Sequence, residues 1–304
     1  SFPTRRSSDL KKLSKLRQDK STGADDISPR LLYNIQEDIC EPLYLLFRKS
    51  LDDGMVPDDW RNANVSPLYK SGCRTNVGNY RPVSLTSQIC KLFESLIRDD
   101  LVNHLEQNLA IADSQHGFRK GRSYLTNLLT FLEKVTGLID HGDSADVIFL
   151  DFAKAFDKVP HQRLLKKLES HGVHGKLLEW MRAWLNDRFQ RVVLNGKSSS
   201  YRKVLSGVPQ GSVLGPILFL IYNNDLDTGV MNWLLKFADD TKLFGKVNTV
   251  SDGLKLQKDL QMLAKWSVEW QMQFNVNKCK TMHIGKKNLD LDYRMNGVVL
   301  DVVE

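Results

Sequence analysis

Apolar residues recur at helical intervals in three stretches of the first half of the chain. Between residues 27 and 51 they are spaced three or four positions apart, and the same period runs through 85–109 and 125–139. This spacing predicts three amphipathic helices. Ser28, followed by a proline, suits the cap and first turn of the first helix. The first ten residues show no such pattern, so we expect a disordered or foreign leader there.

Patterns typical of β-strands follow in the second half. A continuous apolar run directly before Asp151 predicts a buried strand that ends on this residue. Two short β-like runs, at 233–238 and 241–244, flank the adjacent acids Asp239 and Asp240. This arrangement predicts a hairpin with the two acids at its turn.

Two tryptophan pairs each share one face of a predicted helix: Trp180 with Trp184, and Trp266 with Trp270. Aromatic residues at helical spacing are more often packed in a core than free to stack on nucleic-acid bases. We therefore expect both pairs to be core residues.

Three carboxylates stand where burial would be unfavourable unless a cation compensates them: Asp151, Asp239 and Asp240. If the hairpin lies beside the strand that ends on Asp151, oxygens from separate strands converge into a site that suits Mg²⁺. Two such ions, roughly 4 Å apart, can activate an attacking hydroxyl and stabilise a leaving pyrophosphate. Side chains alternate between the faces of a strand, so one of the two adjacent acids should dominate. The alternative for this pair is a solvated turn without chemistry.

A glycine-rich segment, SGVPQGSVLGP, spans residues 206–216 and precedes an apolar run. Glycines at this density indicate backbone that another group approaches closely. A helix should begin at Ser212 or at Gly215, with Pro216 in its first turn.

A basic loop, HGFRKGR, occupies residues 116–122. It holds three cations between and beside two glycines, which would let an anion approach the backbone. A solvated cluster of charges explains the same residues equally well.

The composition is that of an ordinary folded protein, with 41% hydrophobic and 26% charged residues. The net charge of +7 and the pI of about 9.1 suit a polyanionic partner such as nucleic acid, although many basic proteins bind none. The longest apolar run is interrupted by Gly215 and Pro216 and is too short to span a bilayer, so no membrane partner is expected.

The four cysteines are far apart in sequence and form no CxxC pair or cluster with histidine: Cys40, Cys73, Cys90 and Cys279. This spacing does not favour a zinc site. We expect buried thiols in a reducing compartment.

Five segments, in this order, resemble the reverse transcriptases of non-LTR (LINE-type) retrotransposons, and among them the chicken-repeat-1 and jockey-like group. They are NYRPVSL at 79–85, QHGFR at 115–119, LDFAKAFD at 150–157, SGVPQGSVLGPILF at 206–219 and FADD at 237–240. Their order and spacing fit this family over residues 19–285.

The resemblance implies an α+β fold, the fingers and palm of a right-hand polymerase, in which helices pack on an antiparallel palm sheet. Residues 1–18 would be the leader, 19–145 the fingers region, 146–285 the palm with the catalytic motifs, and 286–304 the start of a thumb or a connector. The thumb would be truncated.

The resemblance also implies the activity. The chain would be an RNA-directed DNA polymerase that adds dNTPs to a primer 3′-hydroxyl during retrotransposon replication, with two Mg²⁺ ions for which Mn²⁺ could substitute. Its partners would be an RNA template, a DNA primer and a retrotransposon RNA-binding protein, inside the cell in nucleus and cytoplasm. The alternative is a truncated, inactive or domesticated copy that only binds RNA.

By this resemblance Asp151 and Asp239 would be the principal metal ligands and Asp240 a weaker one. Phe156 would lie under the sugar of the incoming nucleotide, where an aromatic ring excludes a 2′-hydroxyl. RNA-directed RNA polymerases typically carry an acid at this position, five residues after the first aspartate, so Phe156 favours deoxynucleotides. An ordinary core phenylalanine is the alternative.

The remaining roles implied by the resemblance concern the nucleotide and its leaving group. Gln210 and Gly211 would lie beside the nucleotide and template. Arg119, together with Lys120, would bind the triphosphate. Lys278 would protonate the leaving pyrophosphate.

Overall fold

A computed structural model describes residues 6–304 of the chain. These residues form two compact units, and each unit is discontinuous in sequence. The first unit combines the described residues up to Ala110 with His161–Leu218, and the second combines Ile111–Pro160 with Phe219–Glu304. The assignment of fingers to 19–145 and palm to 146–285 follows different boundaries and stays a prediction.

The first unit begins with helix α1 (Arg6–Leu13). The helix packs against α3 (Gln36–Asp52) and α5 (Gln88–Gln107), and Leu13 is fully buried. Lys12 also forms an ion pair with Asp99 on α5. The described part of the predicted leader is therefore helical from Arg6 to Leu13 rather than disordered, whereas its foreign origin stays a prediction; residues 1–5 lie outside the described part of the chain.

The predicted helix over 27–51 is present but divided. Helix α2 (Pro29–Asn34) ends at Asn34, and α3 begins at Gln36, so that Ile35 alone separates them. The predicted cap is confirmed, because the Ser28 hydroxyl accepts a hydrogen bond from the Leu31 amide at 3.1 Å. The other helices of this unit are α4 (Asp58–Arg61), α7 (His161–Ser170) and α8 (Gly175–Leu185).

Aromatic side chains form the core of the first unit. Phe47 stacks on Phe93 with ring centroids 4.7 Å apart, and Trp180 meets Phe93 edge-on at 5.0 Å. Trp180 and Trp184 are both fully buried, as the sequence predicted. The second pair is also packed, since Trp266 and Trp270 each contact the ring of Tyr222 in the second unit.

A mixed sheet completes the first unit. Its order is β2-β1-β4-β5, with β6 beside β4; β1 pairs with β2 in antiparallel and with β4 in parallel orientation. The strands are β1 (Asn62–Tyr69), β2 (Tyr80–Thr86), β4 (Phe189–Leu194), β5 (Lys197–Ser198) and β6 (Arg202–Lys203), with the short helix η1 (Val77–Asn79) before β2.

The second unit is built on a five-stranded sheet of order β12-β9-β3-β8-β7. All its neighbours are antiparallel except β12 and β9, so the predicted antiparallel sheet is present with one parallel edge. The strands are β3 (Ala145–Leu150), β7 (Trp233–Phe237), β8 (Asp240–Lys246), β9 (Lys280–Ile284) and β12 (Asp301–Val302), and a small hairpin of β10 (Arg294–Met295) and β11 (Val298–Val299) lies apart from them.

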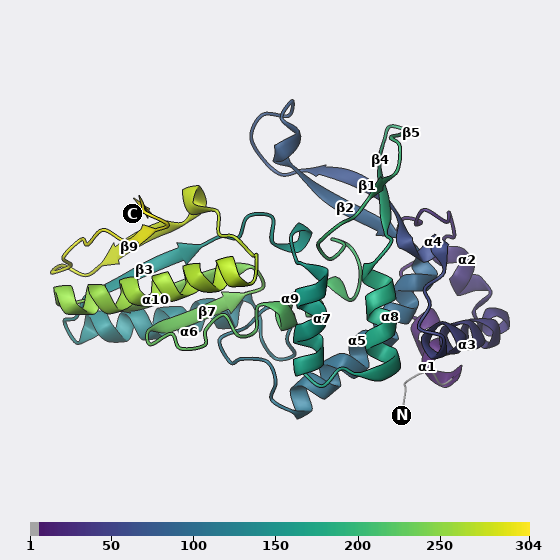
Figure 1. Cartoon of the computed structure of the whole chain (residues 1–304), viewed down its shortest axis with the longest axis horizontal. Coiled ribbons are helices and arrows are strands. Elements are labelled where there is room, and N and C mark those ends of the chain that lie inside the picture. Colours follow the sequence, from purple (N-terminus) through teal and green to yellow (C-terminus); the bar gives the residue numbers. More distant parts are fainter. Residues whose placement is uncertain (1–5) are drawn as a thin grey trace. The chain divides into compact units, whose positions relative to one another are not determined.

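Helices cover both faces of this sheet. Phe131 and Val135 of α6 (Tyr124–Asp140) pack against Val147 and Phe244 on one face. Helix α10 (Val250–Glu269) packs on β8 and lies on the side of the sheet opposite to α6 (Figure 1). Burial on both faces explains why the apolar run of β3 is continuous rather than alternating.

Helix α9 (Gly215–Tyr222) contains the sequence boundary between the two units. The Ser212 hydroxyl accepts a hydrogen bond from the Gly215 amide at 3.0 Å. Of the two predicted starts, Ser212 is thus the capping residue and Gly215 the first helical one.

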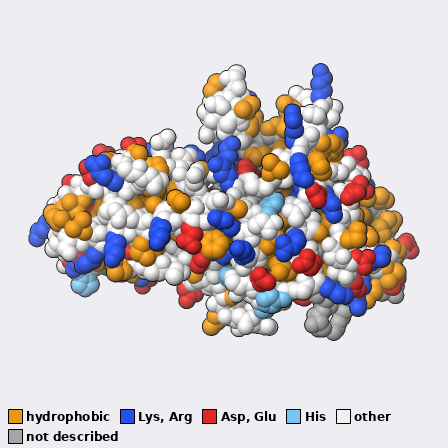
Figure 2. Space-filling model, in the orientation of Figure 1, with side chains coloured by type: hydrophobic (Ala, Val, Ile, Leu, Met, Phe, Trp, Pro, Cys, Tyr) orange, Lys and Arg blue, Asp and Glu red, His pale blue; other side chains and the backbone are white. Residues whose placement is uncertain are grey.

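Charged side chains of both signs lie on the surface. Lys and Arg side chains are spread over the face shown in Figure 2, with Asp and Glu between them.

Cys40, Cys90 and Cys279 are buried as predicted, but Cys73 is exposed because it lies in the loop before η1. Within residues 6–304 no helix combines the length and the apolar character that crossing a membrane requires.

Candidate active site

Asp151 follows the last residue of β3, and backbone pairing holds it in place. Its carbonyl oxygen accepts a hydrogen bond from the Asn275 amide at 2.7 Å. The next residue, Phe152, stacks on Phe274 with ring centroids 4.4 Å apart. The side chain of Asp151 is 30% exposed. Its carboxylate is therefore fixed at the end of the sheet and remains accessible to a ligand.

The hairpin of β7 and β8 brings the other two acids to the same end of the sheet. Leu150 pairs with Thr241, so the next position on each strand holds Asp151 and Asp240. Phe237 pairs with Asp240, which leaves Ala238 and Asp239 as the turn. The predicted hairpin is confirmed, but its turn lies one residue earlier than predicted, because Asp240 is already the first residue of β8.

Lys278 is the cation that lies against Asp151. It ends the short helix η3 (Val276–Lys278) just before β9, and its Nζ is 3.1 Å from Oδ2 of Asp151. Pairing of β9 with β3 thus brings together two residues that are far apart in sequence. Burial raises the pKa of the adjacent Cys279 thiol, which keeps that sulfur protonated at neutral pH.

The acids at this end of the sheet offer carboxylate oxygens, the ligand type that Mg²⁺ prefers. Among the described residues 6–304, no three acidic, histidine or cysteine side chains are grouped as a ready metal site. In the structure the charge of Asp151 is instead compensated by the ammonium group of Lys278. The donor chemistry fits a divalent ion, provided that Asp151 exchanges this ammonium for it.

The segment that leads into the basic loop forms an isolated parallel bridge, between Gln115 and Lys236, with strand β7. The amide of Lys236 on β7 donates to the Ser114 carbonyl, and the His116 amide donates to the Lys236 carbonyl, both at 2.8 Å. The fully buried ammonium of Lys236 lies 3.1 Å from a carboxylate oxygen of Asp227. This buried lysine was not singled out by the sequence, because its pattern is that of an ordinary strand residue.

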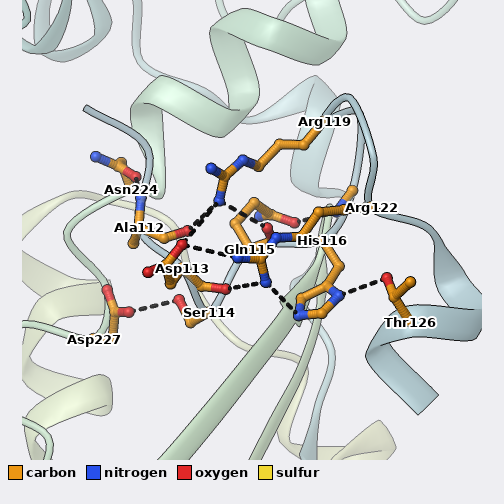
Figure 3. Close-up of polar contacts among 11 residues, drawn as sticks. Ala112, Asp113, Ser114, Gln115, His116, Arg119, Arg122, Thr126, Asn224 and Asp227 are labelled. Atoms are coloured by element: carbon orange, nitrogen blue, oxygen red, sulfur yellow. Dashed lines mark hydrogen bonds and ion pairs between the residues drawn. The ribbon is translucent and has the colours of Figure 1, made fainter. Parts of the chain in front are cut away.

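Arg119 is bonded within its own loop (Figure 3). Its Nη1 donates to the Ala112 carbonyl at 3.0 Å and to the Gln115 carbonyl at 3.4 Å, and it lies 3.8 Å from Asp113. Its side chain is only 19% exposed, whereas Lys120 beside it is exposed. The predicted triphosphate ligand thus also shapes the loop.

His116 forms a neutral link between this loop and α6. Burial, followed by the positive charges of Arg122 and Arg119, lowers the pKa of His116. Its Nε2 lies 3.1 Å from Nη1 of Arg122, which can only donate, so Nε2 accepts. The ring proton is then on Nδ1, which donates to Thr126 Oγ1 at 2.9 Å (Figure 3).

Phe156 lies in the short helix η2 (Ala155–Asp157). It is half-buried and stacks on the fully buried Phe219 of α9, with ring centroids 4.7 Å apart. This support is compatible with the floor of a nucleotide pocket and with a core residue, so both interpretations stand.

Gln210 and Gly211 belong to the first unit, whereas the other candidate residues belong to the second. The Gln210 carbonyl accepts a hydrogen bond from the Ser84 amide at 2.7 Å. Gly211 has φ +118°, and a Cβ on it would lie 2.5 Å from the Ser84 carbonyl oxygen. The close approach predicted for this glycine-rich segment is confirmed, and the approaching group is the chain's own backbone.

Glu94 was missed by the sequence analysis. This fully buried acid on α5 accepts hydrogen bonds from the amides of Val213 and Leu214 at 2.6 and 3.2 Å. It also accepts one from the Trp184 indole at 3.0 Å. It thereby fixes the residues that follow Gln210 and lead into α9.

Sequence comparison shows which known proteins this chain is similar to. The family described as "Reverse transcriptase (RNA-dependent DNA polymerase)" matches residues 68–296. The RNA-directed DNA polymerase from mobile element jockey of Drosophila melanogaster is 29% identical over 88% of this chain and 30% of its own length. The probable RNA-directed DNA polymerases from transposon BS and transposon X-element of the same species are 29% and 27% identical, over 93% and 85% of this chain. The chain spans about a third of the length of these relatives.

Proposed function

The chain belongs to the reverse transcriptase (RNA-dependent DNA polymerase) family, and we propose that it extends the 3′-hydroxyl of a primer with dNTPs on an RNA template. The observation that carries this proposal is the meeting of Asp151, Asp239 and Asp240 at one end of the β3-β8-β7 sheet. The relatives are polymerases of mobile elements by name, so we place this chain in a non-LTR retrotransposon as well.

In this proposal residues 146–285, with the paired strands β9, β3, β8 and β7, are the palm of a right-hand polymerase, and residues 19–145 contribute the fingers. Residues 286–304 would begin a thumb or connector. The support for the palm is the position of the acids, which lie at one end of the strands β3, β8 and β7 and are accessible there.

Two Mg²⁺ ions, with Mn²⁺ as a substitute, would be held mainly by Asp151 and Asp239 and more weakly by Asp240. When bound, such ions activate the attacking hydroxyl and stabilise the leaving pyrophosphate. The chain's own contribution is to hold these carboxylates on rigid strands. Lys278, whose ammonium lies against Asp151, would supply a proton to the pyrophosphate.

The nucleotide would be bound by the residues to which the family resemblance assigns this role. Arg119 would exchange its carbonyl contacts for triphosphate oxygens, while the exposed Lys120 would reach them directly. Phe156, supported from below by Phe219, would lie under the sugar. Gln210 and Gly211 would contact the nucleotide and template.

The partners in this proposal are an RNA template and a DNA primer, which the net charge of +7 suits. A retrotransposon RNA-binding protein would be a further partner, and the site of action would include nucleus and cytoplasm. Both expectations rest on the family.

Extension of a primed poly(rA) template with dTTP and Mg²⁺ tests the proposed function. The purified chain should lengthen the primer, and an Asp151→Asn variant should bind the same primer and template without lengthening it. Binding of RNA by the wild-type chain without extension would instead support the copy that only binds RNA.

A further inference from the structure

The turn that carries Asp239 is held by side chains in addition to the backbone pairing of Phe237 with Asp240. Ala238, directly before Asp239, has φ +56°, in the left-handed region that residues with a Cβ rarely adopt. It is also buried, with 6% of its surface exposed. An alanine keeps this conformation only where its surroundings impose it.

Two buried amides impose it. Oε1 of Gln115 accepts a hydrogen bond from the Ala238 amide at 3.0 Å, and Nδ2 of Asn223 donates to the Ala238 carbonyl at 3.0 Å. Gln115 is 1% exposed and Asn223 is fully buried. Both peptide groups of the turn residue are therefore fixed by side chains from other segments of the second unit.

Gln115 also joins the basic loop to this turn. Its Oε1 accepts a second hydrogen bond, from the Gly117 amide at 2.7 Å. A Cβ on Gly117 would lie 2.5 Å from the Ala238 nitrogen, so only glycine allows this approach. One oxygen atom thus links the loop that contains Arg119 with the turn that precedes Asp239.

The segment of Asn223, the second of these two side chains, is itself held by hydrogen bonds. The buried ammonium of Lys236 donates to the carbonyls of Asn223 and Asn224, at 3.3 and 3.1 Å. The Ser114 hydroxyl donates to Asp227, which also pairs with Lys236 (Figure 3 shows the Ser114 contact). The loop, the turn and the segment after α9 are therefore one hydrogen-bonded assembly.

We propose that Gln115 is a positioning residue of the polymerase, which fixes the Ala238 turn and so the place of Asp239 relative to the loop of Arg119. The inference rests on the proposed function. A catalytic carboxylate must be held to within about 0.5 Å of its productive position, and a displacement of about 1 Å can cost about 100-fold in rate. Gln115 touches no reacting atom and acts only through the backbone that precedes Asp239.

The test compares Gln115→Met, which keeps the volume and removes the acceptor, with Gln257→Met. Gln115 contacts Ala238 at two points, since its Oε1 accepts from the Ala238 amide at 3.0 Å and its Nε2 donates to the Ala238 carbonyl at 3.5 Å. The half-buried Gln257 is the control, because its Nε2 and Oε1 contact the carbonyl and amide of Arg294 in the same way, at 2.9 and 2.8 Å. Gln115→Met should lower kcat about 10- to 100-fold, with the KM for dTTP and the affinity for primer and template changed less than about threefold. Gln257→Met should leave kcat unchanged.

Gln115→Glu provides a conservative rescue, because in the protonated form one carboxyl oxygen can accept from both amides and the other can donate to the Ala238 carbonyl, as Nε2 of Gln115 does at 3.5 Å. Its kcat should be higher than that of Gln115→Met. Equal kcat in the wild type and Gln115→Met would overturn the proposal. So would a rise in the KM for dTTP with kcat preserved, because that result would assign Gln115 to nucleotide binding.

Hydrogen exchange supplies a readout that needs no activity. The amides of Ala238 and Gly117 should exchange slowly in the wild type and Gln257→Met, and fast in Gln115→Met. Fast exchange of both amides in the wild type would contradict their hydrogen bonds to Gln115. A wild-type chain that shows slow exchange but extends no primer would refute the proposed function while supporting the hydrogen bonds that Gln115 accepts.

Discussion

Nζ of Lys278 lies 3.1 Å from the carboxylate of Asp151, so the lysine neutralises the acid that we propose as a metal ligand. Both side chains are accessible to solvent, at 60% and 30% exposure. The pair therefore contributes little to folding stability, within about 1 kcal/mol. Its importance should appear in the reaction.

Replacing Lys278 by Met should change both the Mg²⁺ requirement and the kcat of extension. The variant should need less Mg²⁺ for half-maximal extension, because no ammonium competes for Asp151, and its kcat should fall about 100-fold, because the proton donor is lost. Lys280→Met is a matched control, since Lys280 pairs with Asp301 on β12 instead. A Mg²⁺ titration of both variants checks this, and unchanged kcat in Lys278→Met would refute its role as an acid.

Arg119 and Lys120 should differ in their effects on stability. Neutralising either residue should raise the KM for dTTP, by about 10-fold or more for Arg119, because a charge-assisted hydrogen bond to the triphosphate is lost. Arg119→Ala should also lower Tm, since the carbonyls of Ala112 and Gln115 lose their donor, whereas Lys120→Ala should not. If template affinity falls while the KM stays constant, the loop binds the nucleic-acid backbone.

Phe156 should determine the choice between deoxynucleotides and ribonucleotides. In Phe156→Val the ratio of kcat/KM for dTTP to that for UTP should fall at least about 10-fold, because the ring no longer excludes the 2′-hydroxyl. A core residue would instead lose about 1–3 kcal/mol of stability and impair both substrates alike. Kinetics with both nucleotides and melting curves decide between the two, and an unchanged ratio would remove Phe156 from the site.

Stability should decrease when the pH falls from 7.5 to 5.5. Burial lowers the pKa of His161 and of His116 below the usual value of about 6.5, so the unfolded chain binds more protons than the folded one as the pH drops through this value. The free energy of unfolding is then lost toward acid pH. His161→Gln, which keeps a donor for the Gly207 carbonyl, should flatten this dependence, whereas exposed His174→Gln should leave it unchanged.

Denaturant unfolding of these variants at several pH values measures the slope. An equal slope in the wild type and His161→Gln would show that His161 is not the responsible group.

The sequence predicted the elements of the site because their signals are local. The apolar run of β3 and the paired runs around Asp239 and Asp240 appear as a strand and a hairpin in the structure. The turn was misplaced by one residue, since Ala238 adopts a left-handed conformation that local rules assign to glycine or asparagine. What imposes it is Gln115, which is remote in sequence.

The contacts between distant segments had no periodic signal. Nothing local in Lys278 indicates its pairing with Asp151, which only the resemblance implied. The buried Lys236 and Glu94 also look like surface residues until their partners are in place. The gathering of His161–Leu218 with the N-terminal unit is likewise a property of the folded chain.

The most direct test of the central claim is primer extension by Asp239→Asn at equal occupancy of primer and template. Extension with dTTP and Mg²⁺ should fall below detection in Asp239→Asn, while Asp240→Asn, at the first position of β8, should retain part of it. Affinity for primer and template should stay equal or rise, because repulsion between carboxylate and phosphate is relieved. Extension by Asp239→Asn at the wild-type rate would contradict the assignment of Asp239 as a metal ligand and, with it, the proposed mechanism.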